Sequence, residues 1–122
     1  VISPDKFHNS LCMISDWSGI SFEYAFTFER PVIFIDVPKK ILNSYSDDIS
    51  MEPIEISLRS ELGYVVSPKE LEKIPELIQI SNDNNKNIQE KIKLLRSNTV
   101  FNIGKSKIIG ADYIEELINK LS

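Results

Sequence analysis

The chain has 122 residues and a formal net charge of −4, which fits one domain with a core of its own and argues against a general nucleic-acid binder with a basic face. Its single cysteine, Cys12, excludes a disulfide framework and a cysteine metal cluster and favours a reducing compartment. No apolar stretch reaches the roughly 20 residues of a membrane span, no signal peptide is evident, and the opening Val1 leads us to expect a portion of a longer protein.

The N-terminal part predicts a strand, a tight turn, a helix and a second strand. The apolar run Leu11–Ile14 leads into a turn rich in hydroxyls and glycine, and a helix is expected over Gly19–Phe28. The helix breaks at Arg30-Pro31, and Val32–Ile35 forms the next strand. This order is the building block of a parallel sheet. Its first turn directs free backbone N–H groups and the positive end of the helix dipole at one spot, which suits a phosphate.

The middle of the chain predicts a loop and a third strand. Residues 37–51 are polar and leave the carboxyl end of the second strand, the edge at which open α/β sheets bind ligands. Residues 53–62 predict a short extended piece and one helical turn, which Gly63 ends. Tyr64–Val66 is the third strand.

The C-terminal half predicts helices. Ser67-Pro68-Lys69-Glu70 has the marks of a helix start, and Pro75 either interrupts that helix or begins a new one. After a polar break at 82–85, a second helix places three apolar side chains on one face, namely Ile88, Ile92 and Leu95. The segment Ala111–Leu121 predicts a last helix that packs on the core through the stripe Ile114, Leu117, Ile118 and Leu121.

The turn after the first strand supplies the first candidate site residues. Ser18 fits either a plain helix cap or a phosphate contact beside Gly19, whose missing side chain lets a ligand approach the backbone. The position of the pair directly after a strand, at the ligand-binding edge, supports the phosphate contact. Asp16 either caps the same helix or holds the turn through loop amides, since its charge would repel a diphosphate. Glu23 lies in a helix that is apolar nearly all round, so it is expected to be buried and to bond backbone groups or ligand hydroxyls.

The other candidates are cations and the one histidine. Lys39 and Lys40 follow the second strand on the ligand side, where they either neutralise phosphate or are simply solvated. His8 is the obvious candidate base, but no acid is evident to orient it, which favours a surface role. The sequence holds no Ser-His-Asp set, no metal-ligand cluster and no long glycine-rich phosphate loop. We therefore expect neither a self-contained hydrolase nor a bound metal or cofactor.

Residues 13–25, Met-Ile-Ser-Asp-Trp-Ser-Gly-Ile-Ser-Phe-Glu-Tyr-Ala, continued by residues 30–36, Arg-Pro-Val-Ile-Phe-Ile-Asp, resemble the C-terminal domain of the CDP-glycerol glycerophosphotransferase family. These bacterial enzymes make teichoic acid and related capsular polymers. In the family, an Asp-Tyr-Ser-Ser type turn begins a helix that ends in Pro-Ile-Ile-Phe, and Trp17 and Gly19 depart from that form. The late segment 101–106, with Ala111-Asp112 after it, is also similar; residues 43–95 match weakly.

The resemblance implies the Rossmann-like C-terminal half of a two-domain GT-B transferase, with Ser18, Gly19 and Ser21 at the diphosphate of a CDP-linked donor. The late segment would add Asn102, Gly104 and Ser106. The polymer acceptor and the catalytic histidines would belong to parts outside residues 1–122, so this chain alone would be inactive. The enzyme would be cytoplasmic, at the inner face of the membrane, and would bind no nucleic acid.

A non-catalytic α/β regulatory module, such as a receiver-like domain, is the alternative. Asp36 could serve as its phosphorylated aspartate, but a receiver also needs an acidic cluster at the end of the first strand. Asp16 stands alone there. The transferase interpretation therefore explains more of the sequence.

Overall fold

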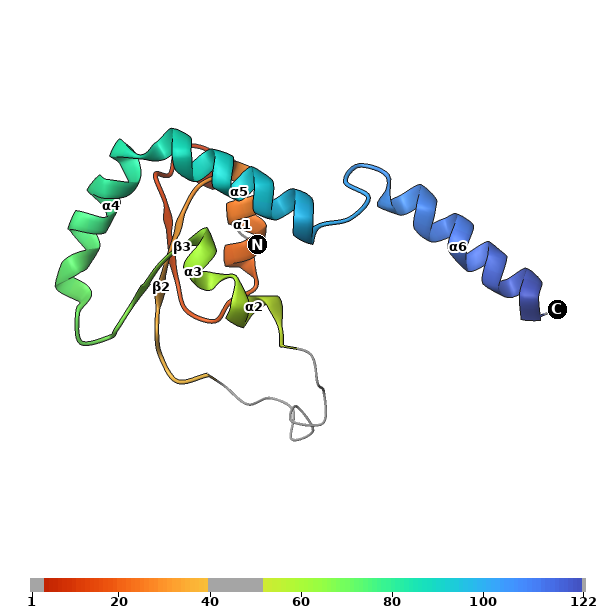
Figure 1. The fold of residues 1–122 in the computed structure, drawn as a ribbon, viewed down its shortest axis with the longest axis horizontal. Helices are drawn as coiled ribbons and strands as arrows, with labels where there is room; N and C mark the ends of the chain where they lie inside the picture. Colours follow the sequence, from red (N-terminus) through yellow and green to blue (C-terminus); the bar gives the residue numbers. More distant parts are fainter. Residues whose placement is uncertain (1–3, 40–51, 122) are drawn as a thin grey trace.

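Three short strands form a parallel sheet (Figure 1). The computed structural model describes residues 4–39 and 52–121. The strands are β1 (Met13–Ser15), β2 (Val32–Ile35) and β3 (Gly63–Val66), and they lie in the order β1-β2-β3. Both pairings are parallel, as the sequence predicts. Helices accompany the strands, so the fold class is α/β. β1 lies slightly further along the chain than the predicted 11–14.

Between β2 and α5 (Asn85–Thr99), the helices differ from the predictions in two places. In chain order they are η1 (Pro4–Phe7), α1 (Ile20–Phe28), α2 (Ile54–Ser57), α3 (Arg59–Leu62), η3 (Leu71–Lys73), α4 (Ile74–Asp83), α5 (Asn85–Thr99) and α6 (Ser106–Leu121). The piece predicted to be extended, 53–56, is helical from Ile54. Residues 67–70 form a tight turn and not a helix start, because the carbonyl and hydroxyl of Ser67 accept the N–H groups of Glu70 and Lys69. The helix begins at Ile74 instead, with Pro75 in its first turn.

The core lies between the sheet and the helices α1, α3 and α5. Its buried side chains are Phe22, Tyr24, Ala25, Val32, Phe34, Leu62 and Ile92. Gly63 lets β3 approach β2, since a Cβ atom there would lie 1.9 Å from the carbonyl oxygen of Val32. Burial raises the pKa of Tyr24, whose hydroxyl lies 2.8 Å from Ser10 Oγ. The helix predicted to carry Ile88, Ile92 and Leu95 on one face is confirmed, because Ile92 is buried in this core and the other two pack against it.

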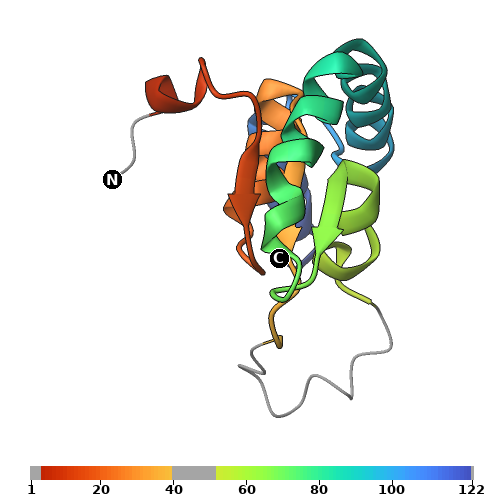
Figure 2. The same ribbon diagram turned by 90° about the vertical axis from the view of Figure 1, so that its left-hand side faces the viewer.

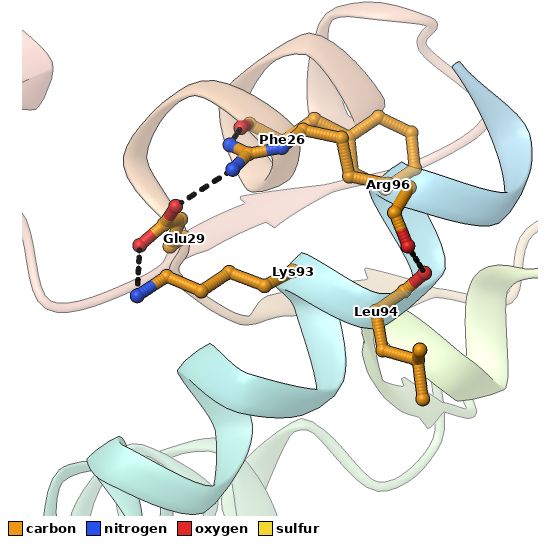
Figure 3. A network of polar contacts seen from close by, with 6 residues as sticks. Phe26, Glu29, Lys93, Leu94 and Arg96 are labelled. Atoms are coloured by element: carbon orange, nitrogen blue, oxygen red, sulfur yellow. Dashed lines mark hydrogen bonds and ion pairs between the residues drawn. The ribbon is translucent and has the colours of Figure 1, made fainter. Parts of the chain in front are cut away.

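Polar contacts join α5 to the end of α1 (Figure 3). Arg96 donates to the carbonyl of Phe26 and, at 2.9 Å, to the carboxylate of Glu29. Lys93 reaches the other oxygen of Glu29 at 3.3 Å. Glu29 has left-handed backbone angles and caps α1 through its N–H, which donates to the carbonyl of Ala25. The network fixes α5 where α1 ends.

The opposite face of the sheet has a lighter cover. α4 lies on this side, away from α1 and α3, as both views show (Figures 1 and 2). Only Ser81 of α4 is buried, and its hydroxyl donates to the carbonyl of Leu77 one turn earlier. Ile14 of β1 remains exposed. The buried core therefore lies mainly on the α1 side.

α6 extends away from the rest of the protein (Figure 1). The prediction that residues 111–121 pack on the core is wrong, because every side chain of α6 is exposed. The helical periodicity is correct, but the apolar stripe of α6 is exposed to solvent. None of the described helices is both long enough and apolar enough to cross a bilayer.

Candidate functional site

A cavity of about 400 Å³ opens at the edge of the sheet where β1 and β2 end. Because the strands are parallel, the segments that follow them meet at the same edge. The turn between β1 and α1, the residues after β2 and the start of α2 form its walls. The lining residues are Asp16, Trp17, Ser18, Gly19, Val37, Pro38, Lys39, Pro53, Glu55 and Ile56. The sequence predicted this edge and four of these residues: Asp16, Ser18, Gly19 and Lys39.

Ser18 and Gly19 form the cavity wall at the start of α1. Gly19 is the N-cap residue, and no side chain caps the helix, so the predicted capping roles of Ser18 and Asp16 are wrong. The carbonyl groups of Ser18 and Gly19 accept the N–H groups of Ser21 and Phe22 at 3.2 and 3.0 Å. Within the described residues, the N–H groups of Gly19 and Ile20 have no acceptor. These are the donors that a helix start offers to an anion.

Gly19 is open to the cavity. A Cβ atom built on it would meet nothing within 4 Å, and its φ of −59° suits any residue. The fold itself therefore does not require glycine at this position. Its absent side chain leaves the backbone accessible from the cavity.

Ser21 does not face the cavity. Its side chain is fully buried, and both its N–H and its hydroxyl donate to the carbonyl of Ser18. The predicted contact of Ser21 with a diphosphate is therefore wrong, because the helix turns this side chain inward. Ser21 stabilises the turn through its two hydrogen bonds to the carbonyl of Ser18.

The predicted acids divide between two places. Asp16 lines the cavity, whereas Glu23 is exposed and lies outside the lining. The expectation that Glu23 is buried and needs a partner is wrong, since α1 turns it to solvent. Glu55, which the sequence analysis did not single out, brings a second carboxylate to the cavity.

Lys39 is exposed and provides the lysine of the lining. Lys40 and most of the predicted loop 37–51 lie outside the described residues. The lining holds two acidic side chains, Asp16 and Glu55, and one basic side chain, Lys39. The charges of these side chains therefore do not by themselves favour binding of an anion. An anionic ligand would rely on the N–H groups and the dipole at the start of α1.

Trp17 and Arg59 form a stacked pair at this edge. The guanidinium carbon of Arg59 lies 3.8 Å from the centre of the Trp17 ring, and the indole N–H donates to the carbonyl of Val37 at 2.7 Å. This contact was not predicted from the sequence. Two signals were available: an arginine between Leu58 and Leu62, which pack in or against the core, and Asp36, a carboxylate that ends a buried strand.

The late segment does not reach the cavity. Asn102 and Gly104 lie in the exposed turn before α6, and Ser106 is the first residue of that helix. The whole segment lies away from the sheet edge (Figure 1). Asn102 and Gly104 have φ angles of 57° and 75°, which these residue types adopt readily. Their role here is in the turn, where the carbonyl of Asn102 accepts the N–H of Lys105 at 2.8 Å. Their predicted place at the donor is wrong for this arrangement.

His8 lies apart from the cavity. Its ring contacts Phe28 edge-on, with ring centres 5.3 Å apart, and it borders a separate cavity of about 250 Å³ together with Arg30. This placement agrees with the surface role predicted for it.

Burial raises the pKa of the Cys12 thiol, which makes it a poor nucleophile.

The described residues contain no group of three or more histidine, cysteine or acidic side chains placed to hold a metal ion. Comparisons with protein-family models, curated proteins and solved structures find no match to this chain. The α/β class therefore rests on the fold described above.

Proposed function

We propose that this chain binds the nucleotide-linked donor of a transferase, which moves glycerol phosphate or a related polyol or sugar unit from a CDP-linked donor to a cell-surface polymer. The observation that carries the proposal is the cavity at the carboxyl edge of the sheet, walled by Ser18 and the open Gly19. Ligands of open α/β sheets bind at such edges. The resemblance of residues 13–25 to the CDP-glycerol glycerophosphotransferases supports the choice of donor.

The diphosphate would lie against the start of α1. The N–H groups of Gly19 and Ile20 would donate to its oxygens, and Lys39 would offset part of its charge. Asp16 and Glu55 would lie toward the uncharged, hydroxyl-bearing part of the donor, where a carboxylate accepts hydrogen bonds without repulsion. This arrangement gives each charged residue of the lining a role.

The rest of the reaction would use a second domain in a GT-B arrangement at the inner face of the membrane. There an acceptor hydroxyl attacks the β-phosphate of the donor. A bond forms between that oxygen and the phosphorus, the bond to the bridging oxygen breaks, and CMP leaves with the electron pair. The proton of the hydroxyl would pass to a general base in the second domain. The positive end of α1 stabilises the negative charge that develops on the diphosphate. We expect the general base to lie outside this chain, so the chain alone is not expected to turn over the donor.

The test is a titration of the chain with CDP-glycerol, CMP and a UDP-sugar. The chain contains one tryptophan, and Trp17 lines the cavity, so its fluorescence reports on binding at this site. We expect CDP-glycerol and CMP to change the emission and the UDP-sugar to do so less. Absence of binding by both cytidine ligands would refute the proposal.

The Gly19→Val variant locates the site. A branched side chain at this open position should weaken donor binding about tenfold or more, while the fold survives because a Cβ atom there meets nothing. Ser18→Ala should weaken binding less, since the backbone donors remain. His8→Ala, at the separate cavity, is the control and should bind as the parent does. Unchanged affinity in a folded Gly19→Val protein would place the ligand elsewhere.

A further inference from the structure

We infer that Arg59 is a positioning residue for the cavity: from α3, it holds Trp17 against the end of β2 and so fixes the Ser18–Gly19 turn that follows. The inference rests on the proposed function, because it concerns the geometry of the same site. Arg59 does not line the cavity, and its side chain is 6% exposed. It would therefore act through Trp17 and not by touching the ligand.

The guanidinium is tied to the end of β2 by two hydrogen bonds. Its Nη1 donates to Asp36 Oδ1 at 3.0 Å, and its Nη2 donates to the carbonyl of Ile35 at 3.3 Å. Two donors on adjacent groups set the plane of the guanidinium as well as its location. Arg59 therefore presents a fixed flat surface at the sheet edge.

Aromatic rings contact this surface. The Trp17 ring centre lies 3.8 Å from Arg59 Cζ, and that of Phe34 lies 5.2 Å from it. The indole N–H is held by the carbonyl of Val37. Trp17 directly precedes Ser18, so a fixed indole restricts the turn that carries the proposed phosphate donors. Through these contacts, residues from α3, β2 and the β1–α1 turn form one unit.

The arrangement is poorly suited to stability alone. Asp36, the acid that pairs with Arg59, is 54% exposed, so water already screens its charge. The Nε of Arg59 is buried and has no hydrogen-bond partner among the described residues. A buried cation with a solvated partner and an unsatisfied donor is costly compared with an apolar side chain of the same size. A positional role explains why such a side chain lies beneath the cavity wall.

Arg96 provides a matched control. Like Arg59, it bridges a main-chain carbonyl and a carboxylate, those of Phe26 and Glu29 (Figure 3). It lies between α1 and α5 and contributes nothing to the cavity lining. Replacing either arginine removes the same kinds of hydrogen bond, but only the change at Arg59 releases Trp17.

The experiment compares Arg59→Met, Arg59→Lys and Arg96→Met. The Kd for CMP and for CDP-glycerol is measured by calorimetry at a temperature where each variant is folded. We expect Arg59→Met to weaken both ligands about tenfold, because donors that are no longer preorganised must be ordered on binding. Arg59→Lys keeps the charge but lacks the planar fork, so it should lose nearly as much. Arg96→Met should bind within about twofold of the parent.

A second readout is the near-ultraviolet circular dichroism of Trp17 without ligand. It should diminish in both Arg59 variants and persist in Arg96→Met. Folded Arg59 variants that bind as the parent does would overturn the inference, as would an Arg59→Lys protein with full affinity, since charge alone would then suffice. If Gly19→Val weakens binding and the Arg59 variants do not, only the inference fails. If the parent chain binds neither ligand, the proposed function fails and the inference fails with it.

Discussion

The helices α5 and α6 have nearly equal length, 15 and 16 residues, and both carry apolar side chains at helical spacing. Their surroundings differ completely. Ile92 of α5 is 1% exposed, with Ile88 and Leu95 packed against the same core. Leu121, at the end of the corresponding stripe of α6, is 89% exposed. The same pattern thus gives a core helix in one region and an exposed helix in the other.

The difference shows what periodicity specifies and what it does not. Spacing of apolar residues defines the face that a helix can bury, but the partner of that face comes from elsewhere in the fold. α5 also makes polar contacts with residues far away in the sequence, because Arg96 donates hydrogen bonds to Phe26 and Glu29 at the end of α1. In α6, Lys120 pairs with Glu116 one turn away, a contact that any isolated helix could form. The three predictions below test this contrast.

The largest effect is expected for Ile92→Ala. The side chain is fully enclosed by the core, so its removal leaves a cavity and should lower the free energy of unfolding by about 2–5 kcal/mol. Urea denaturation measures this loss. Leu94→Ala is the control on the same helix, because Leu94 is 63% exposed and should change the stability by less than about 0.5 kcal/mol. Equal losses would mean that α5 is not packed in this orientation.

An intermediate effect is expected for Arg96→Met. The change removes charge-assisted hydrogen bonds to Phe26 and Glu29 and leaves the partly buried Glu29 with Lys93 alone. We expect a loss of about 1.5–3 kcal/mol. Lys91→Met is the matched control, since Lys91 and its partner Glu61 are both about half exposed and their pair should contribute about 0–1 kcal/mol. A smaller loss at Arg96 than at Lys91 would show that the α1–α5 contact does not hold the fold.

Local sequence signals located the sheet and much of the site. The strand Val32–Ile35 has the predicted bounds, and the helix after the first turn begins within one residue of its predicted start. A parallel strand-turn-helix-strand unit brings residues after successive strands to one edge, so Asp16, Ser18, Gly19 and Lys39 could be placed without a structure. The topology alone determines that neighbourhood.

The remaining features depend on side-chain direction and on distant contacts. Ser21 belongs to the right helix, but the helical period turns its hydroxyl inward onto the carbonyl of Ser18. The stacking of Arg59 on Trp17 joins segments separated by α1, β2 and α2, and no local pattern encodes it. The resemblance alone predicts Asn102 and Gly104 at the donor, but they lie in the turn before α6, and their separation from the cavity depends on where that segment lies.

The smallest effect is expected for α6. Leu117 is 41% exposed, as against 1% for Ile92, so Leu117→Ala should change the free energy of unfolding by less than about 0.5 kcal/mol. A helix of this length without tertiary contacts is marginal in water. Its amides should therefore exchange with deuterium far faster than those of α5, which open only when the core does. Hydrogen exchange followed by mass spectrometry measures both helices in one sample, with α5 as the internal reference. Slow exchange in α6, together with a loss above about 1 kcal/mol in Leu117→Ala, would show that this helix buries its apolar stripe after all and would remove the contrast between the two helices.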